Sequence, residues 1–159
     1  MGLILRNAIA ADVEPLGLVG YAAWCEGLKP LLPEEVHHKV SAADFAGLVR
    51  DLPHEVLVAE LDGVPVALGA TELGDDEISD LWVSPGHAGK GLGTALLAAM
   101  EAVILARGHD GARIQVMTRN TRAFGLYRHR GYVVTWQGLQ WNSMLGIDTD
   151  KTHLKKPLR

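Results

Sequence analysis

The spacing of hydrophobic residues predicts alternating strands and helices in the first third of the chain. Residues 3–5 are apolar and form a short predicted strand. Between residues 13 and 24 apolar residues recur three and four apart, which predicts a helix that is capped by Asp12 and ends near Cys25. A looser stripe with the same period after Pro33 predicts a second helical region.

From residue 55 the hydrophobic period changes to two, which is typical of half-buried strands. The pair Asp62-Gly63 predicts a hairpin turn between two such strands. Residues 77–83 predict a third strand, so we expect an antiparallel meander. Residues 91–107 are almost all apolar or small, which predicts a buried helix.

The last third of the chain shows shorter patterns of both kinds. They predict a strand at 113–118, a short helix at 122–130 that ends before Gly131, a strand at 132–136 and a terminal strand at 153–156. Repeats and linkers are absent from the sequence, so we expect one α/β domain of mixed sheet topology over residues 1–159.

Composition and charge exclude several classes of protein. With 48% hydrophobic and 21% charged residues, the chain has the composition of a globular protein and not of a fibrous or disordered one. The net charge of −4 argues against nucleic acid as a partner. The basic head of a signal peptide and the long apolar run of a membrane helix are both lacking, so we expect a cytoplasmic protein without a membrane partner.

Cysteine and histidine usage argues against a metal site. The single cysteine, Cys25, lies on an apolar helix face and is interpreted as a buried, inert thiol in a reducing compartment. Seven histidines are present, but the zinc motif H-E-x-x-H is not, and the neighbours His37 and His38 point away from each other on a helix. We therefore expect no metal.

A glycine-rich segment between strand 77–83 and helix 91–107 is the strongest chemical signal. Glycines let the backbone curl around an anionic ligand, so that amide groups and the positive end of a helix converge on it. Lys90 is followed by Gly91 and not by Ser or Thr, so the Walker pattern fails, and the dinucleotide pattern lacks its third glycine. What remains is G-x-G-x-G at Gly89, Gly91 and Gly93, preceded by V-x-P at Val83.

This segment resembles the acyl-CoA-binding motif Q/R-x-x-G-x-G/A of the GNAT acyltransferase superfamily. Gly91 and Gly93 match, whereas Ala88 replaces the usual Arg or Gln. The resemblance implies a GNAT fold: a mixed, mostly antiparallel sheet of six to seven strands flanked by about four helices. It also implies that acetyl-CoA binds to the loop and to the preceding strand. The expected cofactor-binding residues there are Leu81, Trp82, Val83, Ala88, Gly89, Lys90, Gly91, Leu92, Gly93 and Thr94.

A second segment resembles the GNAT motif N-x-x-A-x-x-x-Y-x-x-x-G-F/Y. Its matches are Asn120, Ala123, Tyr127, Gly131 and Tyr132. By spacing alone, Asn120 is a helix N-cap and Tyr127 an amphipathic core residue. The resemblance implies instead that Asn120 and Ala123 face the cofactor and that the Tyr127 hydroxyl protonates the departing thiolate.

The acidic segment 72–80 holds the candidates for a general base, because the attacking amine must be neutral. The resemblance favours Glu77, with Asp80 as the alternative and a water relay as a third route. Strand alternation places Glu77 and Asp80 on opposite faces. Asp75 and Asp76 are interpreted as residues of a solvated turn.

The resemblance also implies roles for two further segments. Residues 24–33, with Glu26 and Leu28 among them, are expected to form the wall of the acceptor site. A basic patch on the second motif is either a site for the CoA 3′-phosphate or a solvated helix face. The patch consists of Arg119, Arg122, Arg128 and Arg130.

The resemblance implies an N-acetyltransferase that moves an acetyl group from acetyl-CoA to a primary amine by direct transfer in a ternary complex. The acceptor is an unidentified small molecule or protein. The alternatives are a catalytically silent acyl-CoA sensor and an acyltransferase that uses a longer acyl chain. Exposed terminal strands would support a homodimer.

Overall fold

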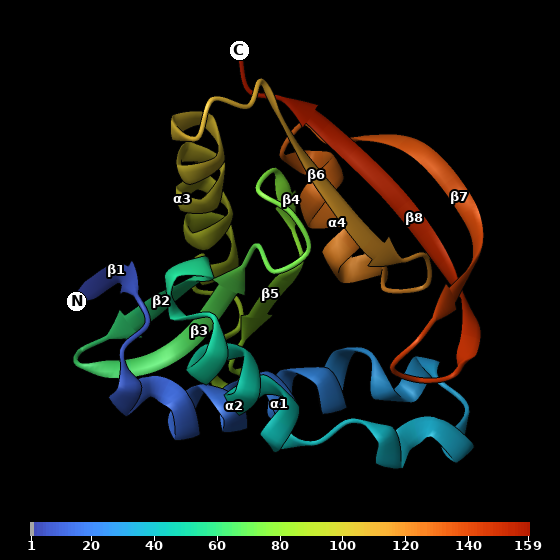
Figure 1. Cartoon of the computed structure of the whole chain (residues 1–159), viewed down its shortest axis with the longest axis horizontal. Helices are drawn as coiled ribbons and strands as arrows, with labels where there is room; N and C mark the ends of the chain where they lie inside the picture. The colour runs from blue at the N-terminus through green and yellow to red at the C-terminus, as the bar shows by residue number, and fades with distance from the viewer. Residues whose placement is uncertain (1) are drawn as a thin grey trace.

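In the computed structural model, which describes residues 2–159, the strands form two four-stranded sheets (Figure 1). The first sheet has the order β1-β2-β3-β5 and the second the order β4-β6-β8-β7. Neighbouring strands are antiparallel except β4 and β6, which run parallel. The strands are β1 (Leu3–Asn7), β2 (Val56–Leu61), β3 (Val64–Ala70), β4 (Glu77–Ile78), β5 (Asp80–Val83), β6 (Gly111–Met117), β7 (Val133–Asn142) and β8 (Ile147–Pro157).

Helices cover the first sheet on both faces. The α-helices are α1 (Val13–Gly27), α2 (Ala42–Asp51), α3 (Leu92–Ala106) and α4 (Thr121–His129). Short 3-10 turns lie at Ala10–Asp12, Lys29–Leu31, Glu34–Lys39, Pro53–Glu55 and Pro85–His87. Leu16 of α1 packs against Val58 and Leu68 on one face, and Leu96 of α3 packs against Ala59 on the other.

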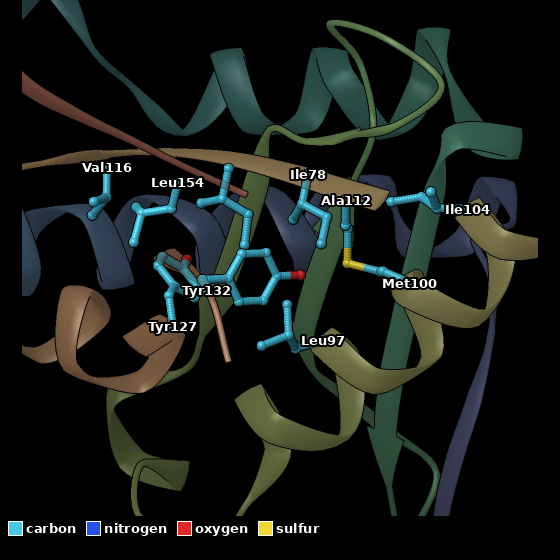
Figure 2. Packing of buried hydrophobic residues seen from close by; sticks show 10 residues of the cluster. Ile78, Leu97, Met100, Ile104, Ala112, Val116, Tyr127, Tyr132 and Leu154 are labelled. Atoms are coloured by element: carbon cyan, nitrogen blue, oxygen red, sulfur yellow. The ribbon is translucent and has the colours of Figure 1, made fainter. Parts of the chain in front are cut away.

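The second sheet packs one face against α3 and α4. Its core joins Leu97 and Met100 of α3 to Ile114 of β6 and Leu154 of β8, and Tyr127 and Tyr132 close it from the α4 side (Figure 2). Because α3 contacts β2, β3, β5 and β6, this helix holds the two sheets together.

The two sheets separate at Ser79. Glu77 and Ile78 pair with β6, whereas Asp80 and the residues after it pair with β3. The predicted strand 77–83 is therefore split in two, and β5 and β6 diverge beyond the split. The α+β class is confirmed, but eight strands in two sheets replace the expected six to seven.

Several predicted boundaries differ from the observed ones. The helical region after Pro33 is a 3-10 turn followed by α2, and the Ser41 amide donates to the Asp44 carboxylate (2.8 Å) where α2 begins. Asp12 does not cap α1: its buried carboxylate binds Arg6 (2.7 Å) and accepts from the Ile9 amide (2.8 Å).

The C-terminal strands are much longer than predicted. The short predictions at 132–136 and 153–156 are parts of β7 and β8, which form a long hairpin. The terminal strand β8 lies inside the second sheet, so the expectation of an exposed C-terminal strand was wrong. The exposed edge strands are β1 and β7.

Candidate active site

The glycine-rich turn after β5 opens the N-terminal end of α3. Gly89 and Gly91 have φ values of 78° and 77°, a left-handed backbone that favours glycine. The first helical hydrogen bond of α3 runs from the Ala95 amide to the Gly91 carbonyl (3.0 Å), so the amides before Ala95 have no partner within the helix. Unpaired amides at the positive end of a helix form a site for an anion.

A cavity of about 370 Å³ extends from this turn between β5 and α4. Of the cofactor-binding residues predicted from the sequence, all except Lys90 line it. Glu26 in the last turn of α1 and Leu28 just after it also line the cavity, and both belong to the segment predicted to form the acceptor wall. Lining residues that the sequence did not assign to a ligand are Ala23, Gly27, Pro85, His87 and Leu126.

Tyr127 is a buried residue of the cavity lining. Its side chain is only 7% exposed, and its hydroxyl makes no hydrogen bond within residues 2–159. Burial, reinforced by the negative charge of Asp80, raises the pKa of this hydroxyl above its usual range. Tyr127 therefore stays protonated at neutral pH and has a proton to donate.

The other tyrosine of this core has a different environment. The Tyr132 hydroxyl donates to Glu101 (2.7 Å), and the rings of Tyr127 and Tyr132 meet edge to face with centroids 6.0 Å apart.

Asn120 caps α4 as its spacing predicts, because its side-chain oxygen accepts from the Ala123 amide (3.4 Å). Asn120 and Ala123 both also line the cavity.

Glu77 lies outside the residues that line the cavity. Its buried carboxylate is 3.3 Å from Arg113 Nη1, and its charge also acts on Lys151. Arg113 binds the Asp76 carboxylate as well (2.8 and 3.0 Å), which lowers the pKa of Asp76. Asp76 lies in a turn and is partly exposed, as predicted, and its carboxylate also forms an ion pair with Arg113.

Asp80 lies on the other side of the split in a polar pocket. Its carboxylate accepts from Trp82 Nε1 (3.0 Å) and lies 2.9 Å from Ser79 Oγ. Trp82 lines the cavity, and the charge of Asp80 acts on Tyr127. Asp80 and Glu77 thus belong to different sheets and have different charged neighbours.

The predicted basic patch is divided. Arg122 lines the cavity, whereas Arg119 donates to the Leu31 carbonyl (3.4 Å) and Arg128 lies over the Phe124 ring. Arg130 is exposed.

Among residues 2–159, no group of three or more acidic, histidine or cysteine side chains is placed to hold a metal ion. No helix in the same residues is long and apolar enough to span a membrane.

The glycine turn at the start of α3 and the buried tyrosine of α4 line one cavity, the arrangement that the two sequence motifs predict. A family model described as the acetyltransferase (GNAT) family matches residues 21–132. The chain belongs to this family, as the sequence motifs predicted.

Similarity to solved structures extends over the whole chain. A GCN5-related N-acetyltransferase from Rhodopseudomonas palustris has a TM-score of 0.82 and 25% identity, covering 99% of this chain and 97% of that one. The structure of yncA from Salmonella typhimurium, solved with its cofactor acetyl-CoA, has a TM-score of 0.76 and 20% identity, covering 100% and 95%. The second of these likenesses supports the fold alone.

Curated relatives match over a shorter segment. A mycothiol acetyltransferase from Clavibacter sepedonicus is 42% identical over 59 residues, which is 37% of this chain and 19% of that protein. The match to a mycothiol acetyltransferase from Beutenbergia cavernae is 45% over 56 residues, or 35% of this chain and 19% of that protein. The chain therefore spans about a fifth of the length of these relatives.

Proposed function

We propose that this protein transfers an acetyl group from acetyl-CoA to a primary amine, directly and within a ternary complex. The observation that carries the proposal is the cavity, which connects the open amides of the glycine turn to the buried hydroxyl of Tyr127. The acceptor is a small molecule or a protein amine. Membership of the acetyltransferase family supports the reaction class.

The residues of the glycine turn fit the anionic part of coenzyme A. The amides of Leu92, Gly93 and Thr94 are directed to a phosphate group, as expected for a helix N-terminus. The buried Nδ1 atom of His87, another lining residue, has no hydrogen-bond partner among the described residues and is available to the same ligand. These groups compensate for Ala88, which has no side-chain donor at the usual Arg or Gln position.

Acetyl-CoA supplies a thioester whose carbonyl carbon is open to attack by an amine. On the protein side, the Ser84 amide donates to the Val66 carbonyl of β3 (2.8 Å). Because successive amides point to opposite sides of a strand, the amides of Leu81 and Val83 point away from β3, toward the open edge of β5. These amides stabilise the oxyanion, and Tyr127 protonates the leaving sulfur.

Replacing Tyr127 by Phe tests the proposal. The variant keeps the buried ring and loses only the proton donor, so we expect kcat to fall by about 10²-fold or more with unchanged affinity for acetyl-CoA. Turnover is measured as thiol release on a panel of primary amines. Tyr132→Phe is the matched control, because its hydroxyl is bound to Glu101 and away from the cavity.

Two outcomes favour the alternative functions. A wild-type protein that binds acetyl-CoA but acetylates none of the amines would be a silent acyl-CoA sensor. Faster turnover with propionyl- or succinyl-CoA than with acetyl-CoA would identify an enzyme for longer acyl chains. A Tyr127→Phe variant with wild-type turnover would refute the role of Tyr127.

We also propose a homodimer and a cytoplasmic location. The free edge of β7 supports the homodimer, because its ten residues include no charged side chain that would oppose pairing with a second copy. The free thiol of Cys25 supports a reducing compartment.

A further inference from the structure

The face of the second sheet that points away from α4 carries a lysine close to the cavity. Ile114 of β6 and Leu154 of β8 belong to the core on the α4 side, so strand alternation places Met117 and Lys151 on the opposite face. Met117 and Lys151 are register partners, so their side chains lie side by side. Met117 packs against the same hydrophobic cluster as Trp82, which lines the cavity. Lys151 therefore lies beside the cluster that supports the cavity wall.

Three polar side chains on the same face as Lys151 are hydrogen-bonded to one another. Gln140 Nε2 donates to Gln115 Oε1 (2.9 Å), and Gln140 Oε1 lies 2.6 Å from His153 Nε2. The Trp136 ring packs on the His153 ring with centroids 4.9 Å apart. These contacts join β6, β7 and β8, so they give the surroundings of Lys151 a fixed shape without using its charge.

The charge of Lys151 has no counter-ion. Lys151 is half-buried, and within residues 2–159 its ammonium forms no salt bridge. Its register partner on β7 is Gly138, which has no side chain, and the carboxylate of Glu77 is bound by Arg113 (3.3 Å). Burial lowers the pKa of Lys151, and the charge of Glu77 offsets only part of this effect. A partly buried cation without a counter-ion is costly for the free protein.

A second donor without a partner lies next to Lys151. Thr149 precedes Lys151 by two residues on β8 and therefore shares its face. Thr149 is 5% exposed, and its buried hydroxyl has no hydrogen-bond partner among residues 2–159. Its register partner is Gln140, whose side chain is bound to Gln115 and His153. An ammonium and a hydroxyl on one face are suitable donors for the oxygens of an anion.

We propose that Lys151 determines which amines are acetylated, by binding a carboxylate or phosphate group on the acceptor. This inference rests on the proposed acetyl transfer and names the substrate class of that reaction. Strand β8 lies two strands from β4 in the sheet, or about 10 Å, a distance that a lysine side chain and a small molecule span together. The anionic group is held at Lys151, and the amine at the other end of the acceptor enters the cavity.

Pairs of amines that differ in one charge test the proposal. The α-amino acids are compared with their amides, and phosphoethanolamine with ethanolamine, with thiol release from acetyl-CoA as the readout. We expect wild-type kcat/KM to be about 10- to 100-fold higher for the acidic member of a pair, because its charge-assisted hydrogen bond is lost in the neutral member. The pairs that show this preference identify the anionic group as carboxylate or phosphate. Acetylation of both members at equal rates, in every pair, would overturn the proposal.

Substitution of Lys151 tests its part in this preference. Lys151→Met keeps the aliphatic stem and removes the charge, so the preference should disappear while kcat/KM for the neutral amine stays near the wild-type value. Lys151→Arg keeps the charge and should restore part of the preference. A preference that persists unchanged in Lys151→Met would contradict the role of Lys151.

The matched control is Lys155→Met. Lys155 is an exposed lysine on the same face of the same strand. Its variant should keep the wild-type preference. Thermal unfolding and acetyl-CoA affinity of all variants show whether the fold and the cavity are intact, and a purely structural effect would change both members of a pair alike.

Binding of the N-acetylated products separates this inference from the proposed function. Products of the same amine pairs are added to the free protein, and the side-chain NMR signals of Lys151 are followed. Acidic products should shift these signals, and their affinity should fall by about 10- to 100-fold in Lys151→Met. If acidic products bind in this way but no amine is acetylated, the anion site holds and the proposed function fails. If amines are acetylated while acidic products leave Lys151 unchanged, the proposed function holds and this inference fails.

Discussion

Gly91 shows how a single residue prepares the site for its ligand. Its φ of 77° lies in the left-handed region, which is energetically unfavourable for residues other than glycine. A Cβ added at this position would nevertheless meet open space. We expect Gly91→Ala to lower the free energy of unfolding by about 1 kcal/mol and to weaken acetyl-CoA binding, measured by urea unfolding and calorimetry. The reason is conformational, because no neighbouring atom obstructs the methyl group.

Gly125 is the matched control for this prediction. It lies inside α4, where a Cβ would also meet open space, but its backbone is helical. Gly125→Ala should therefore stabilise the protein by about 0.5–1 kcal/mol. A Gly91→Ala protein as stable as the wild type, with the same affinity for acetyl-CoA, would show that the left-handed turn is not needed.

At the same scale, the sequence predicted the residues that line the cavity better than the contacts of the acidic residues. Glycine spacing and the tyrosine motif are local, so they identify Gly91, Gly93 and Tyr127 directly. The position of Asp80 opposite Ala70 depends on the register of β3 with β5, which no local pattern specifies. For the same reason the ion pair of Asp76 with Arg113 was invisible before the fold was known.

At the scale of elements, the split between β4 and β5 leaves an edge of β5 unpaired, and residues of this strand line the cavity. Alternation of apolar residues predicts the strand 77–83, but the pattern continues through Ser79 and does not show a change of partner. The lengths of β7 and β8 were missed because most apolar residues of β7 are exposed, whereas β8 buries the polar residues Thr149 and Thr152 beside Leu154. The bounds of helices α1, α3 and α4 were predicted within a few residues.

The proposed dimer depends on one element, the edge strand β7. Strand β7 is a ten-residue edge with exposed Leu139 and Trp141 and no charged residue, which makes it a template for antiparallel pairing with a second β7. We expect light scattering to give a dimer mass for the wild type and a monomer mass for Leu139→Lys. A monomer mass for the wild type at all concentrations would contradict the proposal.

Val64→Lys is the control for the dimer. Val64 is similarly exposed but lies beside the turn between β2 and β3 in the other sheet. This variant should keep the dimer mass, since added charge alone does not disturb pairing through β7.

At the scale of the whole molecule, two diverging sheets form the site. The first sheet brings β5 and the glycine turn, the second brings β6 with α4 packed on it, and α3 joins them (Figure 1). The long β7–β8 hairpin returns toward α1 and α2, where Leu145 packs with Trp24 and Val36. Segments far apart in the sequence therefore enclose one cavity, and all of them must be in place before a ligand can bind.

Titration calorimetry with acetyl-CoA, with ATP and NADH as controls, tests whether the cavity is a site for this ligand. We expect one-site binding of acetyl-CoA, because the cavity joins an anion site at α3 to a buried acid at Tyr127. ATP and NADH should bind far more weakly, since neither has the pantetheine arm that reaches along the cavity. Absence of acetyl-CoA binding, or equal binding of all three ligands, would contradict the proposed acetyl transfer.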